Sequence, residues 1–373
     1  ALFRQAIQEV VPLSDNQILL AATHTHNGAE TLAEEPIADF SHPIAQVRDG
    51  VVDAVVQATA NPFSARIGWN RVDLPGIAIN RFAARVGGDT SKVDMRADFL
   101  KIELENGAYR GVCWHFAAHP TAAMRAEYRT SADYCAAVNR RVVAELGGFC
   151  CFLNGAAGNI NVELGQRSFE RSEQIGADIA DKLIPAIAAP LATSPEIELE
   201  SSLSEIVIPL TTKKPQTGGP PREEVLEYFR RIESMQLVSA DYDGHWRGYQ
   251  ALRRAWWCCA LEDLRKQRDS EPIQICAHRI GPVCLLTVPG EIFIECQFDL
   301  QRAFPDQRTL IIGYANGYVG YIPDSESYET DAYETIPSLL QRAGKEAGTN
   351  IVTAGIELIR ALPRSAKRDG GQM

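Results

Sequence analysis

The pattern of apolar positions in the first half of the chain alternates between helical and extended periodicity. Apolar residues recur every three to four positions in some stretches, as on one face of a helix, and alternate or run continuously in others, as in strands. Helices are predicted over residues 1–11, 42–60, 131–146 and 169–188. Strands are predicted over residues 18–22, 99–104, 111–116 and 149–153, with a hairpin turn at Asn106-Gly107. This alternation is typical of an α/β fold.

The second half begins with a strand pattern over residues 197–210 and a Pro- and Gly-rich loop over 213–221. It continues with two predicted helices, a hairpin, a third helix and a strand, at residues 222–237, 245–267, 273–288, from 292, and 309–314. No internal repeat interrupts this order. We therefore predict one domain over residues 1–373, with mixed β-sheets flanked by helices (α/β, or α+β) and a helical excursion over about 211–270.

Composition and charge narrow the range of partners. Hydrophobic residues make up 45% of the chain and charged residues 23%, as in an ordinary globular protein. The formal net charge of −11 disfavours binding to nucleic acids and to anionic lipid surfaces. No uncharged run approaches the roughly 20 residues of a membrane-spanning helix, so we expect no stable membrane insertion. A small molecule is the expected partner, and the sequence does not indicate an oligomeric state.

Cysteine usage and the first residues bear on the cellular context. The nine cysteines are odd in number, show no CxxC spacing and lie mostly in apolar runs, which favours a reducing, cytoplasmic environment. The first predicted helix starts at Ala1, without an initiator methionine or a capping residue. We therefore expect that a further N-terminal segment precedes this sequence.

Histidines stand where predicted strands end. Side chains two positions apart on a strand point to the same face, so His24 and His26, after the predicted strand over 18–22, are expected to address one point, as in many metal sites. The alternative is a hydrogen-bonded pair at a strand end. His119 also lies where a strand runs out, because the proline after it ends the strand; a lone histidine there is often structural. His115 points to the opposite face from His119, so at most one of them is expected to join His24.

Three further segments carry candidate chemistry. Glu291 follows a buried strand and a Pro-Gly turn, which suits a metal ligand or, alternatively, an acidic residue at a helix N-terminus. The segment over 314–333 holds five tyrosines, whose hydroxyls need partners when buried. It predicts a binding or catalytic wall, although loop packing explains some of the five. The Gly-rich turn within 152–161 lacks a phosphate-binding motif and is expected to face a cleft with its backbone amides.

These motifs occur in order over nearly the whole chain. They are the His24-Thr-His26 segment, Asn80-Arg81, the His119-Pro-Thr run, Ser131-Ala-Asp133, the Gly-Ala-Ala-Gly turn, Pro-Gly-Glu291 and the tyrosine-rich segment ending at Tyr333. Together they resemble the neutral/alkaline (non-lysosomal) ceramidases and their broader relatives. The chain looks like a divergent relative of that family.

The resemblance implies a zinc-dependent amide hydrolase with the ceramidase catalytic fold. By resemblance, Zn²⁺ would be held by His24, His119, Glu291 and Tyr321. The other site residues, near the scissile amide, would be His26, Arg81 and Tyr333. Such a ligand set suits zinc, which lowers the pKa of a bound water from about 15.7 to roughly 7. His26 would pass the proton to the leaving amine, while Arg81 and Tyr333 stabilise the oxyanion.

The chain departs from the ceramidase pattern in the Gly-rich turn. Asn159, Asn161 and Val162 stand where the ceramidases have Asp, Ser and Pro. The immunoglobulin-like domain that follows in the ceramidases is not expected within this sequence. Two amide side chains favour hydrogen bonding to a polar group over lining an alkyl slot. We therefore expect a soluble polar amide, lactam or ester to be a better substrate than long-chain ceramide.

Two other functions are compatible with parts of the sequence. The amidohydrolase barrels also begin with His-x-His after a strand, but they need two further histidines and an aspartate at later strand ends, and only His119 is well placed. A non-catalytic binding module using the tyrosine-rich segment would need no metal. Zinc content separates this module from both enzymes.

Overall fold

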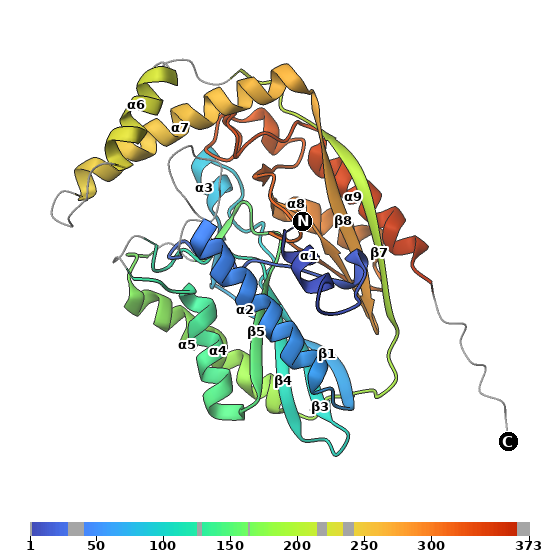
Figure 1. Cartoon of the computed structure of the whole chain (residues 1–373). Coiled ribbons are helices and arrows are strands. Elements are labelled where there is room, and N and C mark those ends of the chain that lie inside the picture. The colour runs from blue at the N-terminus through green and yellow to red at the C-terminus, as the bar shows by residue number, and fades with distance from the viewer. Residues whose placement is uncertain are drawn as a thin grey trace.

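The computed structural model describes residues 2–28, 41–124, 129–162, 165–214, 222–233 and 242–363. Within these residues the strands form two four-stranded and two two-stranded sheets, with helices on their outer faces (Figure 1). This arrangement confirms the predicted fold class of mixed sheets flanked by helices. It excludes the amidohydrolase alternative, which requires a closed barrel of parallel strands.

The first sheet supplies the strand that leads to His119. Its strands lie in the order β1-β3-β4-β5 and span Ala65–Asp73, Arg96–Leu104, Tyr109–Phe116 and Phe149–Asn154. β4 and β5 run parallel, so the loops after them leave from the same edge of the sheet. Helices α4 (Asp133–Leu146) and α5 (Phe169–Ala188) cover one face, where the Trp114 ring donates to the Asn139 side chain of α4 (Figure 1).

The second sheet supplies the strand that leads to Glu291. Its strands lie in the order β11-β9-β8-β7 and span Arg308–Ile312, Val283–Thr287, Ser270–Ile280 and Leu199–Pro209. Helices α8 (Ile294–Ala303) and α9 (Ala347–Ala361) pack against this sheet. One continuous cluster of buried apolar side chains includes residues from both sheets, so the two sheets share a core.

Two short sheets carry the site residues themselves. β2 (Ala78–Asn80) pairs antiparallel with β6 (Ile160–Val162), and β10 (Glu291–Ile292) pairs parallel with β12 (Tyr321–Ile322). Helix α3 (Arg81–Val86) begins directly after β2, because the Asn80 side chain caps it by accepting from the Ala83 amide. These pairings bring together segments that are far apart in the sequence.

The remaining helices are α1 (Leu2–Gln8), α2 (Ser41–Ala60), α6 (Arg222–Glu233) and α7 (Tyr242–Gln267). In Figure 1 α6 and α7 form a pair along one end of the molecule. None of the helices that the structure describes is long and apolar enough to span a membrane. All nine cysteines are free thiols.

Most predicted elements are present with shifted ends, and one predicted strand is wrong. Residues 18–22 form no ladder; Ala21 makes an isolated bridge to Ala315. The hydrophobic pattern missed β1, α3 and α9. In β1 most positions are half-buried, so the strand lacks a clear alternation. Of the predicted helix over 222–237, the structure describes Arg222–Glu233, and the rest of the prediction lies outside the described residues.

Candidate metal centre

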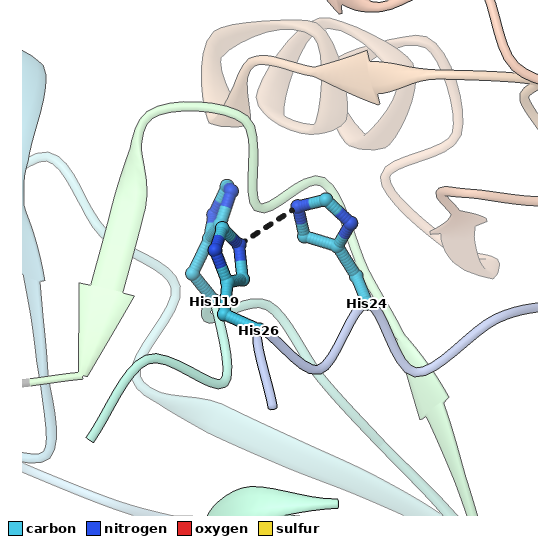
Figure 2. Close-up of side chains that lie close together, drawn as sticks. All are labelled: His24, His26 and His119. Atoms are coloured by element: carbon cyan, nitrogen blue, oxygen red, sulfur yellow. Dashed lines mark hydrogen bonds between the residues drawn. The ribbon is translucent and has the colours of Figure 1, made fainter. Parts of the chain in front are cut away.

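His24 and His26 lie side by side at the candidate site (Figure 2). Their Nε2 atoms are 3.3 Å apart. The backbone of His24 has a φ of 64°, in the left-handed region, so a local turn rather than strand periodicity brings the rings together. The Asn154 side chain holds this segment by donating to the Thr23 carbonyl at 3.1 Å. The two rings therefore face one point, but for a different reason than the strand geometry expected from the sequence.

His119 is fully buried next to this pair and is fixed by the turn over 155–161. Its Nδ1 lies 2.6 Å from the Ala157 carbonyl oxygen and 3.1 Å from that of Ile160. Carbonyl oxygens only accept hydrogen bonds, so Nδ1 carries the proton and Nε2 of the neutral ring does not. Nε2 of His119 therefore presents a lone pair to the site. One nitrogen from each of the three histidines lies within 4.8 Å of the others.

The buried carboxylate of Glu291 faces two of these histidines. Its Oε2 lies 2.9 Å from Nε2 of His119 and 3.4 Å from Nε2 of His24. A ring nitrogen without a proton and a carboxylate oxygen repel each other at 2.9 Å unless a cation or a proton joins them. The donor set therefore fits a metal ion.

Tyr321 is held beside Glu291 by backbone pairing. β10 and β12 place Glu291 directly opposite Tyr321, and residues paired across neighbouring strands point to the same face. The Tyr321 hydroxyl accepts from Nη2 of Arg81 at 3.0 Å, and this nitrogen lies 3.4 Å from Nε2 of His119. The Tyr333 ring lies edge to face with that of Tyr321, 5.8 Å away. All the site residues named from the sequence thus lie in one region.

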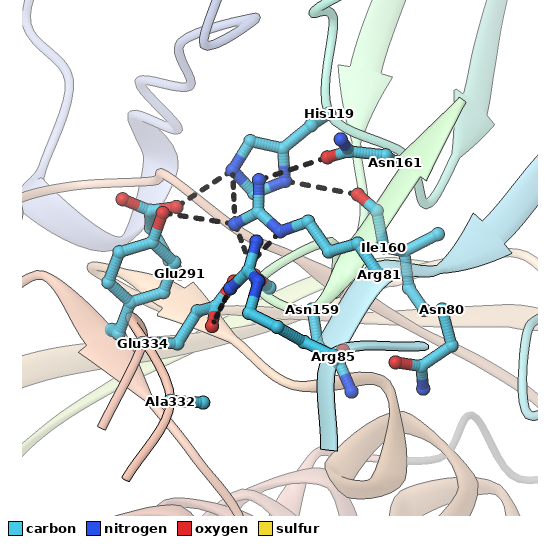
Figure 3. Close-up of polar contacts among 12 residues, drawn as sticks. Asn80, Arg81, Arg85, His119, Asn159, Ile160, Asn161, Glu291, Ala332 and Glu334 are labelled. Atoms are coloured by element: carbon cyan, nitrogen blue, oxygen red, sulfur yellow. Dashed lines mark hydrogen bonds and ion pairs between the residues drawn. The ribbon is translucent and has the colours of Figure 1, made fainter. Parts of the chain in front are cut away.

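Arg81 connects this region to a buried ion-pair network (Figure 3). Its Nη1 donates to Oδ1 of Asn161 and its Nη2 to the Gly158 carbonyl, both at 2.9 Å. Its Nε pairs with Glu334 at 3.0 Å, and the other oxygen of Glu334 pairs with Arg85 at 2.6 Å. Glu334 is fully buried, and no motif in the sequence indicated it.

Two tyrosines that the sequence left unassigned also belong to the site. The Tyr314 ring stacks on the His24 ring with centroids 4.2 Å apart. The Tyr318 hydroxyl donates to Oε1 of Glu291 at 2.5 Å. The signal for both was the density of tyrosines over 314–333, but nothing local decides which rings turn inward.

Burial and neighbouring charges set the protonation states. Burial alone would raise the pKa of Glu291, but His24 and His119 outweigh it and hold this pKa well below its usual value. Burial lowers the pKa of His119 to about 4, and the charge of Arg81 adds to this effect. Desolvation of the ring lowers the pKa of His26, followed by repulsion from His24 and His119, although His26 as a whole residue is exposed. At neutral pH His119 and His26 are neutral and Glu291 is ionised, as metal ligation requires.

The turn over 155–161 offers carbonyl oxygens to the site instead of the expected amides. Those of Ala157 and Ile160 hold His119, and that of Gly158 accepts from Arg81. Glycine is required at position 158, because a Cβ there would lie 2.2 Å from a backbone oxygen of β10.

The asparagines of this turn are structural, which corrects the role expected for them. Asn159 is fully buried; its side chain donates to Glu295 at 2.8 Å and accepts from the Ile294 amide at 2.9 Å. Asn161 uses its oxygen to hold Arg81. The side chain of Asn159 is therefore not available to bind a substrate group.

Similarity to known proteins is found in the fold. No family model and no curated protein sequence matches the chain. Among solved structures, the neutral ceramidase from Pseudomonas aeruginosa superposes with a TM-score of 0.70 at 17% identity, covering 96% of this chain and 63% of that one. This chain has the neutral-ceramidase fold. A ceramidase solved in complex with C2 gives a TM-score of 0.68 at 18% identity, covering 97% of this chain and 65% of that one.

The resemblance inferred from the motifs is thus confirmed at the level of the fold. The sequence identities of 17% and 18% are low. The chain spans slightly less than two thirds of the length of both ceramidases. Its activity therefore has to be argued from its own site residues.

Proposed function

We propose that the protein is a zinc-dependent hydrolase that cleaves an amide bond in a small molecule. The proposal rests on one observation, the 2.9 Å approach of the unprotonated Nε2 of His119 to the carboxylate of Glu291, beside the His24 ring. Two ring nitrogens and a carboxylate around one point suit zinc better than Mg²⁺ or Ca²⁺, which prefer oxygen. The ceramidase fold supports the same class of reaction.

Four side chains are proposed to hold the ion, namely His24, His119, Glu291 and Tyr321. Contacts outside the ligand set orient two of them: backbone carbonyls fix the ring of His119, and Tyr318 holds Glu291. A zinc ion bound there would polarise the amide carbonyl and lower the pKa of a water ligand to roughly 7. His26 belongs to the same nitrogen cluster and is the competing ligand.

We assign His26 to proton transfer. It is the most exposed of the three histidines, whereas His119 is fully buried, so His26 can reach a substrate. Its lowered pKa keeps the imidazole neutral at pH 7 and able to accept a proton. A base in this position takes a proton from the attacking water and returns it to the nitrogen of the leaving amine.

Arg81 and Tyr333 are proposed to stabilise negative charge on the amide oxygen. Burial opposes the charge of Arg81, but Tyr321 and Glu334 raise its pKa, so Arg81 stays cationic. Because its N–H groups already have partners, Arg81 acts through its charge and through the Tyr321 hydroxyl that it contacts. Burial raises the pKa of Tyr333, so its hydroxyl keeps the proton and can donate it.

Metal content and a substrate panel test this function. We expect bound zinc by elemental analysis, and hydrolysis of N-acyl amides that stops on chelation and returns when zinc is added. A purified protein without zinc, after growth in zinc-supplemented medium, would favour the non-catalytic binding module. Bound zinc without hydrolysis of any amide or ester in the panel would contradict the reaction class.

We propose a water-soluble amide, lactam or ester as substrate in preference to long-chain ceramide. The asparagines of the turn no longer carry this argument, since they make structural contacts. It rests on the net charge of −11, which disfavours approach to an anionic membrane surface. We expect a higher kcat/KM for a soluble N-acyl substrate than for detergent-dispersed ceramide. A tenfold advantage for ceramide, about 1.4 kcal/mol in transition-state binding, would overturn this choice.

A further inference from the structure

Three arginines, Arg81, Arg85 and Arg254, lie near the proposed reaction centre of an acidic protein. Arg254, an exposed residue on α7, lies with its guanidinium carbon 5.0 Å from the centre of the Tyr333 ring. Arg85, about half exposed on α3, pairs with the buried Glu334. Glu334 also pairs with Arg81, so one carboxylate serves two guanidinium groups and leaves this network positive. The chain as a whole carries a net charge of −11.

Arg254 lies over an aromatic ring and has no carboxylate partner within the part of the chain that the structure describes. Its guanidinium lies over the Tyr333 ring and has no ion pair or hydrogen bond to any side chain that the structure describes. The helix that carries it is anchored close by. The Leu339 amide donates to the Trp257 carbonyl at 3.0 Å, and the Cys258 thiol donates to the Pro337 carbonyl at 3.6 Å. Arg254 is thus an exposed cation whose N–H groups have no hydrogen-bond partner among the described residues.

Aromatic rings connect Arg254 to the candidate metal centre. Tyr333 contacts Arg254, and its ring also meets Tyr321, 5.8 Å away. Tyr321 is paired with Glu291 across β10 and β12. Tyr321, Tyr333 and Arg254 thus form a continuous row of contacts that leads away from Glu291.

We propose that Arg254 recognises an anionic group of the substrate, so that the preferred substrate is an amide carrying a carboxylate a few bonds from the scissile bond. This inference rests on the amide hydrolysis proposed for the same site. A guanidinium presents paired donors that match a carboxylate, and stacking on an aromatic ring fixes their plane. Arg85 adds positive potential, but its nearest N–H group is bound to Glu334. N-acylated amino acids belong to this chemical class, and ceramide, which is uncharged, does not.

Matched substrates test this specificity. N-acetyl amino acids and their uncharged carboxamides share the scissile acetyl–nitrogen bond, and released acetate reports its cleavage in both. We expect a kcat/KM about tenfold or more higher for the carboxylates, mainly through KM, with an advantage that shrinks as salt is added. In Arg254→Ala the ratio should fall toward one, and in Arg254→Glu below one.

Arg110 provides a matched control. Its guanidinium also lies over an aromatic ring, 5.1 Å from the centre of Phe63, but at the start of β4, whereas His119 follows the end of that strand. Arg110→Ala should keep the wild-type ratio. A wild-type ratio near one, or a preference that survives in Arg254→Ala, overturns the inference.

Direct binding separates this inference from the proposed function. Calorimetry of zinc-supplemented protein with N-acetylglycine should show binding that weakens at least fivefold in Arg254→Ala and is unchanged in Arg110→Ala. If no amide is hydrolysed but this dependence on Arg254 is found, the hydrolase proposal fails and anion recognition stands. If amides are hydrolysed but binding is undetectable, or equal in wild type and Arg254→Ala, the anion proposal fails and the hydrolase stands.

Discussion

Two groups of histidines occupy different kinds of surroundings in this molecule. At the candidate metal centre, nitrogens of His24, His26 and His119 lie within 4.8 Å of one another, and a carboxylate approaches to 2.9 Å. In the sheets, each of His115 and His278 has one hydrogen-bond partner among the described residues, and that partner is uncharged. The Ile311 carbonyl lies 2.9 Å from Nε2 of His115, and the Ser201 hydroxyl lies 2.8 Å from Nδ1 of His278.

This contrast shows that burial and a low pKa do not by themselves identify a metal ligand. Burial lowers the pKa of His115 and of His278, as it lowers that of His119. What distinguishes His119 is an unprotonated nitrogen aimed at a carboxylate, with a second histidine beside it. Several acceptors around one point repel each other, and a cation is what relieves that repulsion.

Removing a proposed ligand should have the largest effect on zinc content and kcat. It tests most directly whether the histidines of the metal centre differ from those in the sheets. His24→Ala and His119→Ala should each lose zinc and lower kcat about a thousandfold or more, roughly 4 kcal/mol, because each removes a nitrogen ligand. Elemental analysis and steady-state kinetics measure both effects. His278→Gln is the matched control from the second group and should keep its zinc. Full zinc content in His119→Ala, or zinc loss in His278→Gln, would reverse the assignment of the two groups.

His26→Ala tests whether the three clustered histidines share one role. We expect this variant to keep zinc while kcat falls roughly a hundredfold to ten-thousandfold, because His26 is assigned to proton transfer. The measurement is zinc content and kcat on the same preparation. Zinc loss as complete as in His24→Ala would show that His26 is a ligand. The proposed roles of His24 and His26 would then have to be exchanged.

The correctly predicted elements are defined by local sequence. Their hydrophobic pattern and their caps or turns lie within one short stretch. α5 shows helical spacing along its whole length and begins directly after Ser168, which caps it. The β3–β4 hairpin turns at Gly107, whose φ of 81° suits glycine. The strand expected over 18–22 is wrong, because only its first residue is buried and the segment makes one isolated bridge in place of a ladder.

The site depends on contacts that no local pattern contains. Arg81 meets Tyr321 across 240 positions, and Arg85 meets Glu334 across 249. The order of motifs pointed to Arg81 and Tyr321 through the family resemblance. Glu334 stands in no motif, and the tyrosine-rich segment does not indicate which of its rings contact Glu291, so the roles of Glu334 and Tyr318 follow only from the folded chain. The turn gives the opposite case, in which residues expected to contact the substrate have a structural role. Asn159 accepts from the Ile294 amide, and Asn161 holds Arg81.

Glu334→Gln should have an intermediate effect, because it acts on the support of the site and leaves the proposed ligands in place. Arg81 and Arg85 would lose their shared buried carboxylate, so we expect kcat to fall about tenfold to a hundredfold with zinc retained. The free energy of unfolding should fall by roughly 2–4 kcal/mol, measured by urea denaturation.

Glu173→Gln is the control for this loss of charge. Glu173 pairs with Arg140 through side chains that are 59% and 60% exposed, so its removal should change stability by less than about 1 kcal/mol. Equal destabilisation in the two variants, or unchanged kcat in Glu334→Gln, would show that the buried network does not support the site.

The smallest expected effect is on the pH dependence of stability. It tests His278, one of the two histidines in the sheets. Burial lowers the pKa of His278 to about 4, with the charge of Arg4 adding to this, whereas a histidine in the unfolded chain has a pKa of about 6.5. Between these values the unfolded chain binds a proton that folded His278 does not, so its contribution to stability is present above about pH 6.5 and is lost as the pH falls toward 4. Near pH 5 this loss amounts to roughly 1–2 kcal/mol.

His278→Gln cannot titrate at this position. Between about pH 7 and 5 the variant should therefore lose less stability than wild type by that amount, measured by urea denaturation at equal zinc concentration. An identical pH dependence of stability in the two proteins would show that His278 titrates as in water. His278 and His119 would then not share a pKa lowered by burial.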